Sequence, residues 1–462
     1  MKSTYYLLLG VAALGTVSCS DSFFEQYPSN SVTENNYYIT DDDFDQGVAA
    51  CYHKLKTQMG YHLNELAYRS DECCKQAMTV SDASTYYFDH FEENSSNAIM
   101  SDIWNAWYNG IYRCNDVLDH LEGREELPNY DKYRGEVLFM RSWWYFNLYR
   151  AFGGVPIAHK VVSPADAKTI RRCTDDEMYA LLTGDLAEAA RLLPASKGAE
   201  KARVTDIAAW TLLAKVYLTF GKPGEAKTAL EEAMKNTSYG LESTTKKVFD
   251  VGNKMNREII FALYYNKTND NGHGYWYSAN TDVLADINNP TPTFKAIYDS
   301  EKDNRLPLIS SYTKIKDNLF AMTKWYDTYD ATYTTQVGND FPHLRYADVV
   351  LMYAEALAES GSSLGDALVW LNKTRTRAGL DALRTEDIPS KGAFIEALAD
   401  ERGREFALEG HRWFDLVRLG LALDRFHEMG YKLDAHNLLF PIPQNQIEIV
   451  NDKTILWQNP GY

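Results

Sequence analysis

Residues 208–233, AAWTLLAKVYLTFGKPGEAKTALEEA, decide the fold class of this chain. Apolar residues recur there at steps of three and four in two runs, which is the period of an α-helix. The small residues Ala214 and Ala226 allow two helices to approach closely, while Trp210 and Tyr217 fill the space between neighbours. The intervening GKPG ends the first helix and starts the second. The segment therefore predicts a helix-turn-helix pair.

The spacing of this pair matches the tetratricopeptide repeat, and other parts of the chain show the same helical period. Each pair exposes an apolar face that another pair must cover, so the pairs are expected to stack into one body. We predict an all-α fold of tetratricopeptide-like pairs in a single domain over residues 19–462. The expected pairs lie near residues 103–152, 203–236, 344–378 and 393–423.

Two long segments, residues 60–98 and 237–344, lose the helical period and fill with Asn, Asp, Thr, Gly and Tyr. They predict loop-rich insertions with minor short strands. Loops of this length in a compact protein are usually functional. The chain holds 32 tyrosines and 10 tryptophans, and these residue types suit wet, contact-rich surfaces.

The N-terminus predicts export and lipid anchoring. Residues 1–18 form a short basic start, an apolar run and small residues before Cys19, which is the zoning of a signal peptide and too short for a permanent membrane span. In bacterial lipoproteins the cysteine at this cleavage point carries the acyl chains. Cys19 is therefore the predicted lipidation site, and the lipid is the only expected membrane attachment.

Net charge and cysteine content argue against nucleic-acid binding, a disulfide framework and a zinc site. The chain has 64 acidic and 47 basic residues and a formal net charge of −17, so its surface repels phosphate backbones, and nucleic acid is not expected as a partner. After Cys19, five cysteines remain without a C-x-x-C spacing, so neither a disulfide framework nor a zinc site is indicated.

Catalytic and metal motifs are incomplete. The GSSLG run at residues 361–365 fits G-x-S-x-G, but a helical period precedes it instead of a strand, so we expect an ordinary turn. Acidic pairs such as Asp42-Asp43, Glu92-Glu93 and Asp175-Asp176 could serve a glycosidase, but only the separation of two carboxyl groups across a cleft would show it. The series Asp299, Glu301 and Asp303 resembles part of a calcium loop, although Asn304 replaces its glycine. We predict no cofactor, and a structural calcium stays an open alternative.

The run ERGREFALEGHRWFD, residues 401–415, mixes acids, arginines and a histidine as an active site would. On a helix Glu401, Glu405 and Glu409 follow at steps of four, with arginines between them. This pattern favours an ion-pair network that clamps neighbouring helices.

Blocks from end to end of the chain carry a resemblance to a known family. They are Ser18-Cys19-Ser20-Asp21, IWNAWYNGIYRCN (103–115), RSWWYF (141–146), FGGVP (152–156), RYADV (345–349), ERGREF (401–406), RWFDL (412–416), FPIP (440–443) and QNPGY (458–462). In these blocks the chain resembles the SusD/RagB-type outer-membrane nutrient-binding lipoproteins of Gram-negative glycan users.

The resemblance implies a tetratricopeptide-like scaffold, a lipid anchor on the outer membrane facing the cell exterior, and no enzymatic activity. It also implies a TonB-dependent, SusC-like transporter as partner, to which the protein delivers a captured oligosaccharide or polysaccharide. A peptide-binding member of the same scaffold and a glycoside hydrolase are the alternatives.

A sugar ligand sets chemical requirements that the insertions meet. A pyranose ring packs its C–H face on a flat aromatic ring, and its hydroxyls need polar partners. Clustered aromatics in Asn- and Asp-rich loops provide both. The predicted glycan-binding residues are Tyr86, Tyr87, Tyr275, Trp276, Tyr277 and Trp325, with Asp71 and Asn94 as hydrogen-bonding candidates.

Trp276 lies between two tyrosines after a Gly-His-Gly bend that lets the loop project. We expect Trp276→Ala to weaken glycan binding about thirtyfold, because a stacking aromatic contributes ~2 kcal/mol or more. Calorimetry with the glycan, beside a thermal melt, checks this. A large fall in melting temperature with intact binding would instead assign Trp276 to the core.

Overall fold

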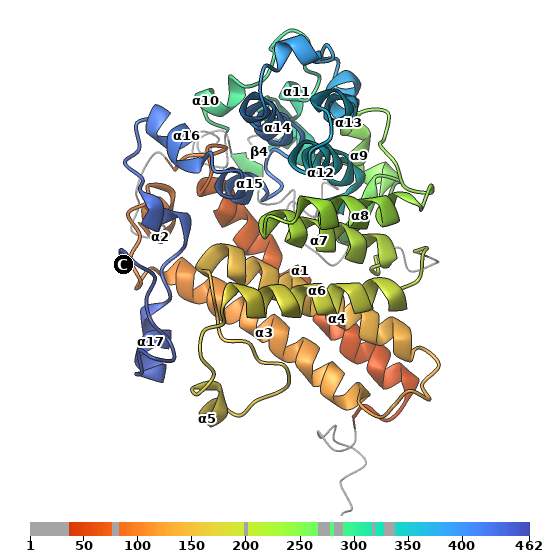
Figure 1. The fold of residues 1–462 in the computed structure, drawn as a ribbon, viewed down its shortest axis with the longest axis vertical. Coiled ribbons are helices and arrows are strands. Elements are labelled where there is room, and N and C mark those ends of the chain that lie inside the picture. The colour runs from red at the N-terminus through yellow and green to blue at the C-terminus, as the bar shows by residue number, and fades with distance from the viewer. Residues whose placement is uncertain are drawn as a thin grey trace, which may run out of the picture.

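The computed structural model describes residues 37–75, 83–197, 202–266, 278–280, 290–316, 319–327 and 338–462. Helices make up most of this part of the chain (Figure 1). None of its helices combines the length and the apolarity that a membrane crossing requires. The predicted signal peptide and Cys19 lie outside the described residues.

The main helices form one continuous stack in which each helix packs on the next along the chain (Figure 1). The stack also joins α8 to α12 across the long insertion. Its members are α3 (Ala98–Leu121), α4 (Tyr130–Phe152), α6 (Asp175–Leu192), α7 (Asp206–Thr219), α8 (Pro223–Met234), α12 (Tyr346–Glu359), α13 (Leu364–Arg377) and α14 (Lys391–Glu405). The predicted all-α class of stacked helix pairs is confirmed.

The pair α7 and α8 shows why these residues form a repeat. Leu213, Ala214, Ala226 and Leu230 are almost completely buried where the two helices meet. Gly221 between them has φ +66°, a left-handed conformation that glycine adopts without strain. Pro223 opens α8, where its missing N–H costs no helical hydrogen bond.

Two helices of the body were not predicted from the sequence. Helix α1 (Asp41–Tyr68) packs on α3 and α4, and its last nine residues lie in the predicted loop insertion at 60–98. Helix α6 lies between α4 and α7, and Thr174 and Glu177 form a capping box at its start. Its buried residues between Met178 and Ala190 recur at steps of three and four, so the sequence carries the helical period although the helix was not predicted.

The predicted helical stretch at 393–423 is divided. Helix α14 ends at Glu405, and α15 (Arg412–Arg418) and α16 (Ala422–Glu428) follow as separate short helices. Leu408 and Gly410 take positive φ between the first two, which no continuous helix permits. Other short helices are α2 (Ala83–Asp89), α5 (Pro164–Ala167), α9 (Thr245–Val248), α10 (Pro292–Lys295), α11 (Leu306–Ser310) and α17 (Gln444–Val450).

Short antiparallel strands lie at and within the predicted 237–344 insertion. Strand β1 (Ile259–Leu263) pairs with β5 (Phe341–Arg345), so the two ends of the insertion lie side by side. A three-stranded sheet has the order β2 (Ser278–Asn280), β4 (Leu319–Met322) and β3 (Tyr312–Lys316). Strand β5 leads directly into α12 and so connects this region to the helix stack.

Helices α3 and α4 approach closely at Gly110. A Cβ atom at Gly110 would overlap the indole ring of Trp144, which is completely buried on α4. Gly184 on α6 offers the opposite case, because it is exposed and a Cβ atom there would meet open space.

We expect Gly110→Ala to lower the free energy of unfolding by about 1–3 kcal/mol, since the methyl group must push the buried Trp144 ring aside. The matched variant Gly184→Ala should leave stability unchanged or raise it by up to ~1 kcal/mol, because alanine favours the helix. Denaturant unfolding of both variants measures the difference. Equal effects at the two sites would contradict the packing.

Candidate functional site

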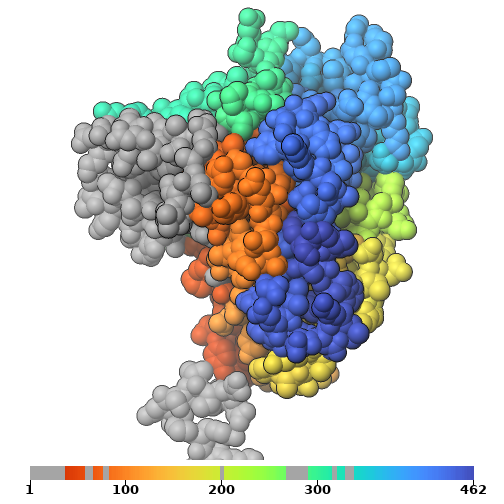
Figure 2. All heavy atoms as spheres, turned by 90° about the vertical axis from the view of Figure 1, so that its left-hand side faces the viewer, coloured from red at the N-terminus to blue at the C-terminus, as the bar shows by residue number. Residues whose placement is uncertain are grey.

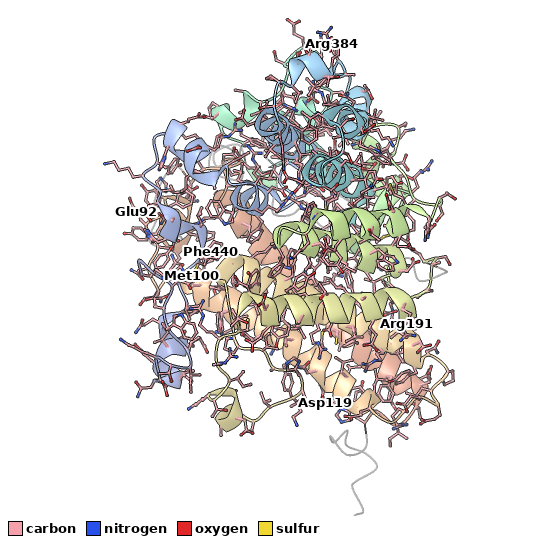
Figure 3. The ribbon with its side chains drawn as sticks, in the orientation of Figure 1. Glu92, Met100, Asp119, Arg191, Arg384 and Phe440 are labelled. Carbon is pink, nitrogen blue, oxygen red and sulfur yellow. The ribbon has the colours of Figure 1, made fainter. Side chains whose placement is uncertain are left out.

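The short helix α2 presents two neighbouring tyrosines at the surface. Tyr87 is 39% exposed, and the partly exposed Tyr86 meets it edge to face at 6.0 Å between ring centroids. The segment that contains α2 lies on one face of the molecule beside the C-terminal segment (Figure 2). Glu92, just beyond α2, lies at the edge of the molecule (Figure 3). These aromatic rings are therefore accessible to a ligand.

Buried side chains hold α2 in place. Phe88 is completely buried and packs edge to face on Phe440 at 5.2 Å. The buried guanidinium of Arg69 donates to the Phe88 carbonyl at 2.8 Å and pairs with Glu93 at 2.8 Å. A helix of seven residues is marginal by itself, so these contacts fix the orientation of its two tyrosines.

The residues after α2 extend the same surface. The imidazole of His90 stacks on the Tyr86 ring at 4.0 Å. Phe91, with φ 59°, turns its ring into the core against Trp413 and Phe426. Asn94 is exposed, and its side-chain oxygen accepts the Ser96 N–H at 2.9 Å. The structure thus places Tyr86, Tyr87 and Asn94 on one short exposed stretch.

Two predicted contacts are wrong, because their side chains are buried. Trp325 is 1% exposed and packs between Phe341 and Phe249 at 5.9 and 5.1 Å. Asp71 is 2% exposed, and both of its carboxylate oxygens accept from Arg412 at 2.7 Å. Neither residue can touch a surface ligand. Tyr275, Trp276 and Tyr277 lie outside the described residues and stay predictions.

A cavity of about 810 Å³ between α1 and β1 contains a further exposed aromatic residue. Tyr264 is 46% exposed, and the Lys254 ammonium lies 4.4 Å from its ring centroid. Tyr52 and His53 of α1 also line the cavity. Tyr264 belongs to the aromatic-rich insertion, so composition pointed to its region, but its exposure depends on the path of β1.

The Cys74 thiol and the Asp89 carboxyl group, near the two tyrosines, have raised pKa values. Burial raises the pKa of the Cys74 thiol to about 11, so it stays protonated near neutral pH and is a poor nucleophile. Burial likewise raises the pKa of Asp89 to about 6. The Asp89 carboxylate accepts the Lys75 backbone N–H at 2.8 Å.

The motifs that suggested hydrolysis have structural roles. Ser363 caps the N-terminus of α13, where its hydroxyl accepts the Asp366 N–H at 3.1 Å. Helix α12 precedes that turn, so it has no strand before it. Glu93 pairs with Arg69, and Asp175 lies in the first turn of α6. At the suggested calcium loop, the Asp303 carboxylate binds Arg305 at 2.8 Å.

The run 401–415 forms the predicted ion-pair network. The completely buried Arg345 donates to Glu409 at 2.8 Å, to Glu258 at 2.8 Å and to Glu405 at 2.6 Å. Arg305 binds Glu401 and Glu405 at 2.7 and 3.0 Å. Partners from the insertion and from β5 therefore join the helix α14, which the sequence did not indicate.

The arginines of the network favour the charged form of Glu405. Burial alone would raise the pKa of Glu405, but Arg377, Arg345 and Arg305 outweigh it and lower that pKa below its ordinary value. The depressed pKa in the folded protein means that Glu405 stabilises the fold above about pH 4.5. That contribution is lost as the pH falls through the folded-state pKa.

The stacked helix pairs define a helical-repeat scaffold protein. Short inserted elements add exposed aromatic rings of the kind found at ligand-binding surfaces. A model described as "Starch-binding associating with outer membrane" matches residues 20–218, and one described as the SusD family matches residues 304–462. The chain belongs to the SusD/RagB family.

Individual relatives agree over nearly the whole chain. The SusD-like protein P2 of Formosa agariphila is 25% identical over 100% of this chain and 99% of its own length. The starch-binding protein SusD of Bacteroides thetaiotaomicron is 24% identical over 76% of both chains. A solved laminarin-binding SusD-like protein superposes with a TM-score of 0.75 at 25% identity, covering 92% of this chain and 100% of that one.

We expect Arg345→Met to lower the free energy of unfolding by about 3–5 kcal/mol at neutral pH, because it leaves buried carboxylates without their partner. The control Arg384→Met removes surface ion pairs to Glu386 and Asp387 at one end of the molecule (Figure 3) and should leave the free energy of unfolding nearly unchanged. Denaturant unfolding compares them. Similar losses would show that the buried network does not support the fold.

Proposed function

We propose that this protein is a non-catalytic cell-surface lipoprotein that captures an oligosaccharide or polysaccharide. The lipid on Cys19 holds it to the outer membrane with the ligand surface facing the exterior. It then delivers the glycan to a TonB-dependent, SusC-like transporter.

The paired tyrosines of α2 carry the proposal. Tyr86 and Tyr87 expose ring surface at the end of a helix that Phe88 anchors in the core. A flat ring offers the C–H face of a pyranose a desolvated contact, and its edge is available for hydroxyl groups. Asn94 adds an exposed amide on the same stretch, which suits a sugar hydroxyl.

Relatives support a glycan as the ligand. The SusD protein of Bacteroides thetaiotaomicron is named as starch-binding, and a solved SusD-like protein of similar fold is named as laminarin-binding. The net charge of −17 agrees with a neutral ligand, because a strongly negative surface repels polyanions.

The anchor and the transporter partner rest on the sequence. Cys19 follows a signal-like segment, and the matching family model is described as associating with the outer membrane. The transporter partner is inferred from the family resemblance. With acyl chains as the anchor, each buried methylene contributes about 0.8 kcal/mol to membrane attachment.

We expect Tyr86→Ala and Tyr87→Ala each to weaken glycan binding at least tenfold, because each removes a ring from the paired surface. Affinity electrophoresis in gels containing starch or laminarin, followed by calorimetry with the retarding glycan, measures this. The control Tyr112→Ala removes a tyrosine that is 48% exposed on α3 and should bind as the parent does.

Three outcomes would contradict the proposal. Equal losses in all three variants would show that exposed tyrosines act nonspecifically. Binding of peptides from a protein digest, with no retardation by glycans, would favour the peptide-binding alternative. Release of reducing sugar from the polysaccharides would show a hydrolase.

A further inference from the structure

Three side chains of metal-ligating type come together beneath the exposed tyrosines. Cys74, Asp89 and His90 each offer one ligand atom, and these atoms all lie within 4.8 Å of one another. In the part of the chain that the structure describes, this is the cluster of such side chains with metal-binding spacing. The cluster is separate from the buried ion-pair network.

We propose that Cys74, Asp89 and His90 form a binding site for one divalent transition-metal ion, with Zn²⁺ as the best fit. Sulfur, carboxylate oxygen and imidazole nitrogen are together the donors that Zn²⁺ takes in proteins. The thiol transfers its proton to solvent when the sulfur coordinates the ion. Three protein ligands leave the fourth tetrahedral position to water.

The backbone around the cluster holds the three groups in position. The Lys75 N–H donates to Asp89 Oδ2 at 2.8 Å, which joins the Cys74 segment to the end of α2. Cys73 forms an isolated antiparallel bridge with Pro290. Asp89 ends α2 and His90 follows it directly, so the position of α2 places both residues. Two chain segments thus supply ligands that are already close before an ion binds.

The second contacts of the ligands agree with a metal site. His90 Nδ1 lies 2.9 Å from the Tyr86 carbonyl oxygen and 3.3 Å from Asp89 Oδ2. If Nε2 coordinates the ion, Nδ1–H can donate to the Tyr86 carbonyl, which is how a metal-bound histidine is commonly oriented. The Tyr431 hydroxyl lies 3.8 Å from Cys74 Sγ and completes the polar surroundings.

The cluster is both sheltered and reachable. The Asp89 side chain is 2% exposed, whereas the His90 side chain is 25% exposed, so an ion has a path from solvent. Ligand atoms around tetrahedral Zn²⁺ lie roughly 3.5 Å apart, given bonds of about 2.0–2.3 Å. Binding therefore needs side-chain movements of only about 1 Å.

A bound ion would stiffen the aromatic surface. It would tie α2 to the Cys74 segment and fix the imidazole on which the Tyr86 ring stacks at 4.0 Å. An ion that binds the folded chain and not the unfolded chain also raises the melting temperature. This inference stands independently of the ligand that Tyr86 and Tyr87 contact.

The test uses the purified full-length protein, reduced with a phosphine because added thiols compete for the ion. Titration calorimetry with Zn²⁺ should give one site per chain. Co²⁺ should produce a thiolate-to-cobalt charge-transfer band in the near ultraviolet. We expect Cys74→Ser to remove that band and His90→Gln to weaken Zn²⁺ binding at least tenfold.

His120 provides a matched control. It also stacks on a tyrosine, Tyr38, at 4.5 Å, and its Nδ1 lies 3.6 Å from the carboxylate of Asp116. It has the imidazole, the ring and the acid, but it is not part of the cluster with Cys74. His120→Gln should bind Zn²⁺ as the parent does and keep the cobalt band.

The contrary results are equally clear. A cobalt spectrum without a thiolate band in the parent protein would overturn the site, and so would a band that survives Cys74→Ser. Equal losses in His90→Gln and His120→Gln would show surface histidine binding only. Thermal melts without metal establish that each variant is folded, and His90→Gln, at a partly exposed position, keeps the test valid if Cys74→Ser unfolds.

Discussion

The buried contact of Arg345 with three glutamates fixes how the helix stack and the strand insertion fit together. Arg345 ends β5, Glu258 immediately precedes β1, and Glu405 ends α14, while Glu409 follows it. These segments are far apart in the sequence. A charge left without its partner in the interior is strongly destabilising, so only the arrangement that brings all four residues together is allowed.

A second set of buried charges acts in the same way on the C-terminal helices. Asp348 of α12 binds Arg402 of α14 at 2.9 Å, and Arg402 in turn binds Asp415 of α15 at 2.7 Å. The pair Asp71 and Arg412 adds the segment that leads to α2. Apolar packing can slide by small steps, whereas a bidentate contact such as that of Arg412 with Asp71 has a fixed geometry. The charged run 401–415 therefore fixes the positions of α12, α14 and α15 relative to one another.

The sequence predicts the helix pairs well because a period of 3.6 residues is local information. Helix α6 was missed although Met178, Leu182 and Leu186 follow this period. The prediction fails at the break near Leu408, where the chain takes a positive φ that the local period does not show. The aromatic residues show a different limit. Trp325 and Tyr87 both lie in aromatic-rich insertions, yet one is 1% exposed and the other 39%. Composition cannot distinguish them, because exposure depends on which long-range partner covers each ring. Asp71 was misassigned for the same reason, since its partner Arg412 lies 341 residues away.

The proposed ligand surface and the helical scaffold are held by different contacts. Helix α2 has seven residues and cannot be stable alone, so Phe88, Phe91 and Arg69 anchor it from within. The residues that face solvent, Tyr86, Tyr87 and Asn94, make few of these anchoring contacts. Substitutions at the outer positions are therefore expected to alter this surface without disturbing the core. The same division agrees with the position of the family blocks in this chain, which include buried charges such as Arg345 and Arg412 and leave Tyr86 and Tyr87 outside them.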